Sequence, residues 1–477
     1  MAFENYGINN QIIWKSGGKY MNIYTTDKIR NVALLGHGGS GKSSLAEAMA
    51  YLSGITSRMG KIEDGNTVSD YGKEEQKRKI SISTSVIPIE WEGYKINILD
   101  TPGFFDFTGE VEEALSAAGA GGCEPQSEAV WRQADHYHVP RMIYVSNMDV
   151  DNASFRQVVE DMTAEFGKKM APFHLPIREN EKFVGYVNVI TETGNRWQGK
   201  EVVECPVPEY NKPNLQICRD TLMEAVAETS EEMWERYFGG ETFSEAEIRA
   251  ALRSNVCDGS IVPMTMGSNV LCQGIYTLLD DVIKYFPSPE NREVAGINMK
   301  TNEIYHADYD FAKAKSAYIW KTIVDPFIGK YSLIKVNSGV LKTDDLIYNV
   351  DKDIEEKIGK IYVLQGNKPI EVKELHAGDI GALAKLTAAR TGNSLSTKAT
   401  TIKYGKWEMP VPYTYMRYKP KNKGDVDKLS QSLQKISHED LTMKYVNDAE
   451  NRQMLLYGMG DLHLEVIASR LLNEYKV

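Results

Sequence analysis

The chain has 477 residues, of which 42% are hydrophobic and 25% are charged, and its formal net charge is −11. Because this length exceeds a single compact core, two to four globular domains of roughly 100–200 residues each are expected. The acidic balance argues against an extended nucleic-acid-binding face and leaves RNA contacts to local basic patches.

Membrane and secreted proteins are disfavoured by the residue pattern. No stretch approaches the roughly 18 consecutive apolar residues of a membrane span, and the N-terminus lacks the order of a signal peptide. Five scattered cysteines without a Cys-x-x-Cys pair favour reduced thiols over a zinc site or a disulfide framework. A cytoplasmic location is therefore predicted. Residues 1–20 show no periodicity and are predicted to be a disordered extension.

A phosphate-binding loop is predicted after the first buried strand. Residues 31–35 read as that strand, and residues 44–50, beginning with Ser44, read as a helix. The eight residues between them match G-x-x-x-x-G-K-[ST]: Gly36, His37, Gly38, Gly39, Ser40, Gly41, Lys42 and Ser43. Glycines let backbone N–H groups wrap a phosphate, Lys42 would reach the outer phosphates, and the Ser43 hydroxyl would bind Mg²⁺. A nucleotide site is favoured over the alternative of a glycine-rich turn without a ligand.

A second motif, D-x-x-G, follows a strand predicted at 94–99. Asp100 is placed to hold Mg²⁺ through water, and the Gly103 N–H is placed to sense a γ-phosphate. This motif is weak alone, but it is a strong signal behind a phosphate loop. The polar segment 61–79 reads either as a solvated loop or as a switch that orders on the nucleotide.

Ordered motifs along nearly the whole chain are similar to one protein family. They are TDKIRNV at 26–32, the phosphate loop, DTPG at 100–103, CEPQSEAVWRQAD at 123–135, DPFIGK at 325–330, SG at 338–339, LSQSLQK at 429–435 and GMGDLHLE at 458–465. Residues 26–477 thus resemble the first three domains of translation elongation factor G, in particular a divergent paralogous branch of that family.

The resemblance implies an order of three domains that the sequence pattern supports. An α/β P-loop GTP-binding domain is expected at 21–290, with an inserted subdomain at about 150–260. An all-β barrel domain at 307–404 fits the short alternating runs between Gly, Asp and Asn turns. An α+β split-βαβ (ferredoxin-like) domain is expected at 408–477. The family continues into two further domains, so this sequence is not expected to complete translocation.

GTP or GDP with Mg²⁺ is the implied ligand, and one residue of the catalytic apparatus departs from the family. The implied metal-binding residues are Ser43, Ser81 and Asp100, where Ser81 replaces the family's switch threonine but keeps a hydroxyl. Phe104 stands where the family usually has a histidine that positions the attacking water. Because phenylalanine has no donor or acceptor, slow or absent hydrolysis is predicted.

Two other residues complete the catalytic prediction. Lys42 keeps its role at the phosphates. His37 is the nearest alternative group for orienting water, although a packing role in the loop is favoured for it.

The guanine-reading segment N-K-x-D of the family corresponds to residues 146–149. Asp149 remains and would accept hydrogen bonds from guanine N1–H and the 2-amino group. Ser146 replaces the asparagine that reads the carbonyl side, and Asn147 replaces the lysine whose stem covers the ring. A lost base contact costs roughly 1–3 kcal/mol, so weaker guanine affinity with partly retained selectivity is predicted. The last guanine-supporting loop corresponds to Gly267, Ser268 and Asn269.

A central strand of the nucleotide domain is predicted to be missing. Between helices predicted at 109–118 and 124–137 lies only the segment Gly-Ala-Gly-Gly-Cys at 119–123, without the apolar run of a parallel strand. An omitted segment or an altered chain is the favoured explanation, since a missing central strand would leave backbone groups unpaired inside a core.

The last 70 residues contain a predicted amphipathic helix at 425–436. Its apolar residues recur at helical spacing and are assigned to the core: Val426, Leu429, Leu433 and Ile436. His463 is interpreted as a capping or packing residue. A basic cluster either contacts rRNA phosphates or, more commonly for such runs, forms a solvated edge: Arg417, Lys419, Lys421 and Lys423.

The leading interpretation is a GTP-binding translation factor that acts at the ribosome, on rRNA and ribosomal proteins, with slow or ribosome-dependent hydrolysis. The runner-up is a non-hydrolysing, nucleotide-gated regulator that binds the ribosome, which Phe104 favours. A small-molecule P-loop kinase is disfavoured, because it needs an acceptor pocket and a lid rather than these accessory domains. A monomer without DNA or membrane partners is predicted.

Overall fold

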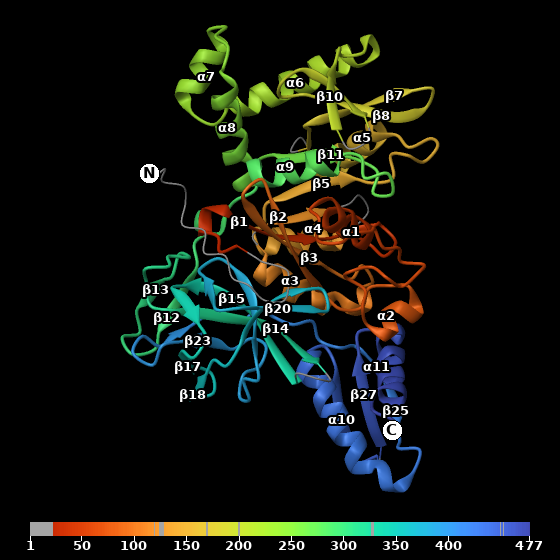
Figure 1. Cartoon of the computed structure of the whole chain (residues 1–477), viewed down its shortest axis with the longest axis vertical. Helices are drawn as coiled ribbons and strands as arrows, with labels where there is room; N and C mark the ends of the chain where they lie inside the picture. The colour runs from red at the N-terminus through yellow and green to blue at the C-terminus, as the bar shows by residue number, and fades with distance from the viewer. Residues whose placement is uncertain are drawn as a thin grey trace, which may run out of the picture. The chain divides into compact units, whose positions relative to one another are not determined.

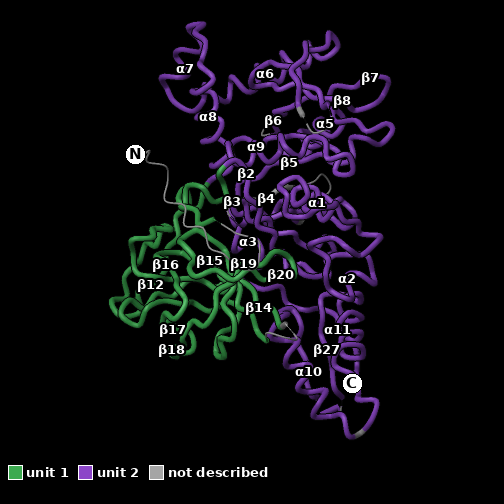
Figure 2. The backbone as a smooth tube through the Cα atoms, in the orientation of Figure 1, with its two compact units in different colours: residues 1–29, 93–95, 288–406 green, residues 30–92, 96–287, 407–477 purple. Residues whose placement is uncertain are grey.

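The computed structural model describes residues 22–477 except 119, 124–127, 168–169, 199–200, 326–328, 449 and 452. Two compact units make up the chain (Figure 2). The nucleotide unit contains residues 30–92, 96–287 and 407–477, and the barrel unit contains residues up to 29, 93–95 and 288–406. The extension predicted at 1–20 lies outside the described residues, as do parts of two family motifs.

A seven-stranded sheet forms the centre of the nucleotide unit (Figure 1). Its strands, in spatial order, are β2 (Ser85–Trp91), β3 (Tyr94–Asp100), β1 (Ile29–Leu34), β4 (Ala120–Cys123), β5 (Arg141–Val145), β11 (Val262–Met266) and β6 (Met170–Pro172). The pairs from β1 to β6 are parallel. Parallel strands are buried on both faces and read as apolar runs, which makes β1, β3 and β5 recognisable in the sequence.

Helices join these strands in the alternation expected of a doubly wound fold. They are α1 (Lys42–Leu52), α2 (Lys73–Arg78), α3 (Thr108–Ala117), α4 (Glu128–His136), α5 (Phe155–Phe166) and α9 (Ile275–Tyr285). A short 3₁₀ turn, η2 (Phe105–Phe107), precedes α3. The strand and helix predicted on either side of the phosphate loop are confirmed as β1 and α1.

The prediction that a central strand is missing is wrong. Strand β4 lies between β1 and β5, with Gly122 paired to Leu34 on one side and to Met142 on the other. A β-ladder is made by backbone N–H and C=O groups, which glycine supplies as well as any residue. The expected apolar run is absent because two of the four residues of this strand are glycines.

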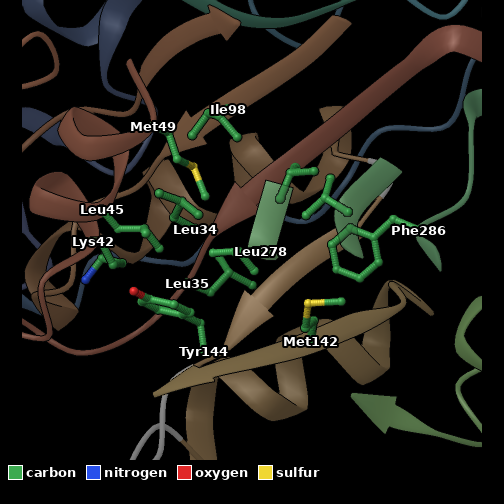
Figure 3. A pocket seen from close by; sticks show the side chains of 12 residues that line it. Leu34, Leu35, Lys42, Leu45, Met49, Ile98, Met142, Tyr144, Leu278 and Phe286 are labelled. Atoms are coloured by element: carbon green, nitrogen blue, oxygen red, sulfur yellow. The ribbon is translucent and has the colours of Figure 1, made fainter. Parts of the chain in front are cut away.

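A small apolar cavity lies beside this strand, between the sheet and helices α1 and α9. Its volume is about 40 Å³, and its lining includes Leu34, Met142, Leu278 and Phe286 (Figure 3). Leu34 and Met142 are the residues in register with Gly122.

An inserted subdomain follows β5 and α5. Its four-stranded antiparallel sheet contains β7 (His174–Glu179), β8 (Lys182–Asn188), β9 (Thr193–Gln198) and β10 (Glu201–Cys205). The helices are α6 (Lys212–Ala227), α7 (Glu231–Phe238) and α8 (Glu245–Cys257). The chain turns between α6 and α7, where the Ser230 hydroxyl caps α7 by accepting a hydrogen bond from the Met233 N–H.

The barrel unit is all-β. Its main sheet has the order β18 (Ile354–Lys357), β17 (Leu346–Asn349), β23 (Ser394–Ser396), β14 (Ser316–Asp325), β15 (Gly329–Ser338), β22 (Ile380–Ala384), β19 (Ile361–Gln365) and β20 (Lys368–Val372). Smaller sheets pair β13 (Ile304–His306), β12 (Ala295–Asn298) and β24 (Ile402–Lys403), and β16 (Val340–Lys342) with β21 (Glu374–His376). Ile319, Ile334, Leu341 and Val363 lie in its core.

Residues 407–477 pack two helices on a small antiparallel sheet. The strands have the order β25 (Thr414–Tyr418), β27 (Gln453–Gly458) and β26 (Lys444–Asp448), and the helices are α10 (Val426–Glu439) and α11 (Asp461–Asn473). The core assignment holds for Leu429, Leu433 and Ile436. It is wrong for Val426, whose side chain at the first residue of α10 is half exposed. In the described part of the chain, no helix has the length and apolarity needed to span a membrane.

Candidate nucleotide-binding site

The predicted phosphate loop joins β1 to α1. Gly39 and Gly41 have φ angles of 85° and 95°, a left-handed region that side chains disfavour, and Gly41 is the N-cap of α1. The Lys42 ammonium lies inside the loop, where it donates to the carbonyls of Gly36 at 2.9 Å and His37 at 2.8 Å. The sequence therefore folds here into a turn that encloses a buried positive charge.

The D-x-x-G motif lies against the same loop. A Cβ on Gly103 would come within 2.5 Å of Gly38 N and His37 O, so only glycine allows this approach. The Phe104 ring covers the loop at Gly38, where a built Cβ would lie 2.8 Å from the nearest ring carbon. The exposed His37 ring has its Nδ1 2.8 Å from the Gly38 carbonyl of its own loop.

The predicted metal-binding residues also converge. The hydroxyls of Ser43 and Ser81 are 2.9 Å apart. Within the described ranges, neither carboxylate oxygen of buried Asp100 has a hydrogen-bond partner of normal geometry. Burial raises the pKa of Asp100 to about 6, with the charge of Asp70 adding to the rise and the hydroxyls of Ser69 and Ser43 opposing it. A buried carboxylate beside hydroxyl groups supplies the kind of oxygen ligands that Mg²⁺ prefers.

Asp70 is a fourth oxygen donor that the sequence reasoning missed. Its pKa is raised by burial, and the hydroxyls of Ser81 and Ser43 oppose that rise, which places the carboxylate beside both. In the part of the chain that the structure describes, no three His, Cys, Asp or Glu side chains form a cage for a metal ion. Two carboxylates beside two hydroxyls suit Mg²⁺, which commonly combines one or two carboxylates with phosphates and water.

Glu75 was also missed, and it shapes the loop that carries Asp70 and Ser81. Its Oε1 accepts hydrogen bonds from the N–H groups of Ile82 at 3.0 Å and Ser83 at 3.1 Å, and its Oε2 accepts one from Gly72 at 2.8 Å. Burial, together with the charge of Asp70, raises the pKa of Glu75 to about 7. A buried carboxylate thus closes residues 72–83 into a loop. The only sequence signal was a glutamate at the third position of a short helix.

On the base side, the two predicted loops are joined by backbone hydrogen bonds. Gly267 N–H donates to Val145 O, and Met148 N–H donates to Gly267 O, both at 3.0 Å. Asp149 is exposed at the loop surface, and Asn147 has a left-handed φ of 57°.

Arg178 of the inserted subdomain braces this base loop, and nothing in the sequence indicated it. Its guanidinium donates to the carbonyls of Met148 and Ala153, each at 2.9 Å. The loop that carries Asp149 is thereby held from both sides, by the 267–269 loop and by the inserted subdomain.

Family models match three consecutive parts of the chain. The elongation factor Tu GTP binding domain matches residues 27–288, elongation factor G domain 2 matches 314–398, and elongation factor G domain III matches 409–477. The chain belongs to the elongation factor G family. A crystal structure of a Thermus thermophilus protein is similar, with a TM-score of 0.84 and 29% identity over 94% of this chain. The match spans 66% of that protein.

These matches confirm the predicted fold class for this elongation factor G family member. The doubly wound sheet is the GTP-binding domain, and the barrel unit and residues 409–477 correspond to domains 2 and III of the family. A guanine nucleotide is the ligand of the matched domain family. The roles of individual site residues stay predictions.

Domain III contacts the segments next to the predicted metal-binding residues. Ser469 of α11 donates to Glu74 of α2 at 2.6 Å, and Arg78 of α2 pairs with Glu465 at 3.2 Å. The His463 N–H donates to Asp106, which follows the D-x-x-G motif, at 3.0 Å. The loops on both sides of the site are therefore in direct contact with α11.

The His463 side chain, predicted to cap or pack, is buried and turned into domain III. Its Nδ1 accepts a hydrogen bond from the Met459 N–H at 3.0 Å, and its Nε2 lies 2.6 Å from Asp440 Oδ2. Burial acts to raise the pKa of Asp440, but the His463 contact outweighs it and lowers the value to about 2.

Proposed function

We propose that the protein is a GTP-binding translation factor that acts at the ribosome and hydrolyses GTP slowly, or only when a ribosome engages it. The observation that carries this proposal is that the side chains predicted to bind phosphate and metal lie around one loop, with an apolar residue at the predicted water position. Lys42, Ser43 and Asp100 are present around the loop, whereas Phe104 lies on it.

The chain's own residues divide the work of binding. Lys42 and the loop N–H groups would bind the β- and γ-phosphates. Ser43 and Ser81 would bind Mg²⁺ directly, and Asp100 and Asp70 would hold it through water. The metal supplies neutralisation of the charge on the phosphates. Ser146, Asn147, Asp149 and the 267–269 loop would surround the base.

The catalytic apparatus departs from the family at the group that would orient the attacking water. Orienting that water is a main contribution of protein groups to phosphoryl transfer, and a well-placed acid–base group is worth about 10²–10⁴ in rate. Phe104 offers neither a donor nor an acceptor, and its ring is 39% exposed beside Gly38. A packing role is favoured for His37, whose Nδ1 lies 2.8 Å from the Gly38 carbonyl of its own loop.

A non-hydrolysing regulator is the second candidate function. Its support is the contact between α11 and the segments beside the metal-binding residues, since a nucleotide that orders α2 would also order domain III. In that case bound GTP would hold the protein in a conformation that binds the ribosome, and the protein would leave the ribosome after exchange of GTP for GDP. We place either form in the cytoplasm as a monomer with ribosomal partners.

Phosphate release from GTP, measured with and without ribosomes, tests the proposal. Wild type is expected to turn over far below the roughly 10 s⁻¹ that is typical of enzymes, and Phe104→His is expected to be at least about tenfold faster with ribosomes. Phe105→His is the matched control, because Phe105 is 60% exposed and was not assigned to the site. Wild-type turnover at an ordinary rate would contradict the role given to Phe104.

The same preparations separate the two candidates. Ribosome binding that requires GTP, without phosphate release by wild type, supports the regulator. Wild type that binds ribosomes equally well with GTP, with GDP and without nucleotide contradicts both forms of the proposal.

A further inference from the structure

The asparagine missing from position 146 leaves a gap in the base side of the site. Ser146 follows the end of β5, and its hydroxyl donates to the carbonyl of Ser40 in the phosphate loop at 3.2 Å. A serine side chain ends at that single group, so its reach from the base loop to the phosphate loop depends on one hydroxyl.

A second side chain reaches the phosphate loop from the opposite base loop. Asn269 is buried, with 2% of its surface exposed. Its Nδ2 donates to the carbonyl of Gly41 at 3.2 Å, and its Oδ1 accepts a hydrogen bond from the Tyr144 hydroxyl at 3.1 Å. A Cβ built on Gly41 would lie 3.1 Å from Asn269 Nδ2 and 3.8 Å from Ser146 Oγ, so both side chains approach Gly41.

We propose that Asn269 supplies, from the 267–269 loop, a carboxamide that ties the base side of the site to the phosphate loop, which Ser146 reaches through a hydroxyl alone. Asn269 is therefore a positioning residue for the guanine nucleotide. This inference rests on the nucleotide-binding part of the proposed function, and it does not depend on hydrolysis or on the ribosome.

The geometry explains why this tie affects ligand binding. Gly41 is the N-cap of α1, next to the Lys42 and Ser43 that would contact phosphate and metal. Tyr144 belongs to β5, two residues before Ser146. Asn269 thus links three elements that have to hold one nucleotide at both ends. Removing the Asn269 carboxamide deletes both of these hydrogen bonds, and with them the link between the phosphate loop and β5.

Calorimetric titration of the full chain with GDP and Mg²⁺ tests the assignment. Asn269→Ala is expected to weaken GDP binding by roughly 5- to 30-fold. Asn269→Asp should weaken it similarly, because it keeps the size and the acceptor for Tyr144 but loses the N–H donor to Gly41. Asn255→Ala is the matched control: Asn255 also buries a carboxamide that donates to a backbone carbonyl, that of Ala225 at 2.9 Å, in the inserted subdomain. It should lower the melting temperature and leave GDP affinity within about twofold of wild type.

A rescue experiment distinguishes a specific tie to the phosphate loop from a general contribution of Asn269 to stability. Ser146→Asn should recover most of the lost affinity in the Asn269→Ala background and should gain less in wild type, giving a non-additive double-mutant cycle. Unchanged affinity in Asn269→Ala, or additive effects of the two substitutions, would overturn the inference. If wild type binds no GDP, both this inference and the proposed function fail. Normal GDP binding without ribosome activity contradicts the proposed function alone.

Discussion

The phosphate side and the base side of the site are built differently from one another. The phosphate side comes from one continuous loop, its helix and the D-x-x-G turn, and it keeps the family's residues at Lys42, Ser43 and Asp100. The base side is assembled from separate loops around 146–149 and 267–269. Its family pattern is altered at two positions, and side chains from elsewhere support it.

The difference between the two sides shows where substitution can be compensated. A phosphate needs a ring of N–H groups at fixed positions, and that ring comes from backbone that only this loop provides. A base loop can be held by any side chain that reaches it, as Arg178 does. Changes should therefore be severe on the phosphate side and graded on the base side.

The largest expected effect is at Lys42. Lys42→Ala removes a buried ammonium that would contact two phosphates, and hydrogen bonds to charged groups are each worth about 1.5–3 kcal/mol. A loss of GTP and GDP affinity of at least about 100-fold is expected in equilibrium titrations. Lys61→Ala, an exposed lysine in the following polar segment, is the control and should bind normally. An equally small change of nucleotide affinity in both variants would contradict the importance given to the phosphate side.

A smaller effect is expected at Asp149. Asp149→Asn loses an acceptor for guanine N1–H and the 2-amino group, so discrimination between GDP and ADP should fall by roughly 10- to 100-fold. Asp151→Asn changes another exposed aspartate of the same loop and should leave discrimination intact. Competition titrations with the two nucleotides measure the ratio. Equal binding of GDP and ADP by wild type would contradict the role of Asp149.

The smallest effect is a pH dependence at Glu75. Its pKa of about 7 in the folded chain exceeds the usual value near 4.5, so the folded state binds more protons than the unfolded state between these values. The free energy of unfolding of the metal- and nucleotide-free chain should therefore contain a component that falls as pH rises from about 4.5 to 7. In Glu75→Gln that component should be absent, which makes the slope of stability against pH less negative.

Glu74→Gln provides the matched control for that slope. Burial acts to raise the pKa of Glu74, but the Ser469 hydroxyl and Arg78 outweigh it and lower the pKa. Stability from Glu74 is thus fully present above pH 4.5 and is lost only at lower pH. Denaturant titrations at several pH values should show Glu74→Gln less stable throughout, with an unchanged slope between about pH 5 and 7. Identical slopes in wild type and Glu75→Gln would contradict the assignment.

Local signals in the sequence were sufficient for the phosphate side. The pattern from Gly36 to Ser43 determines its own geometry, and the apolar runs at β1, β3 and β5 are the direct consequence of burial on both faces. Strand β4 was not recognised in the sequence, because glycine supplies backbone pairing without the apolar side chains that identify a buried strand. The prediction that this strand is missing therefore failed because of two residues, Gly121 and Gly122.

Long-range contacts explain what the sequence did not reveal in the site. Glu75 accepts hydrogen bonds from the Ile82 and Ser83 N–H groups across a loop. Arg178 donates to Met148 from the inserted subdomain. Asn269 donates to Gly41, which lies 228 positions earlier in the chain. None of these has a periodicity or a fixed spacing. Such partners depend on tertiary packing, which a local pattern does not encode.

The most direct test of the central claim is a single-turnover experiment on wild type with γ-labelled GTP and saturating ribosomes. In the proposed function, GTP binds through Lys42, Ser43 and Asp100, and Phe104 offers no donor or acceptor to orient the attacking water. We therefore expect bound GTP to persist for many seconds on the ribosome, with its γ-phosphate retained, and to be cleaved at least about tenfold faster in Phe104→His. Rapid cleavage by wild type, at a rate that Phe104→His does not exceed, would contradict the account.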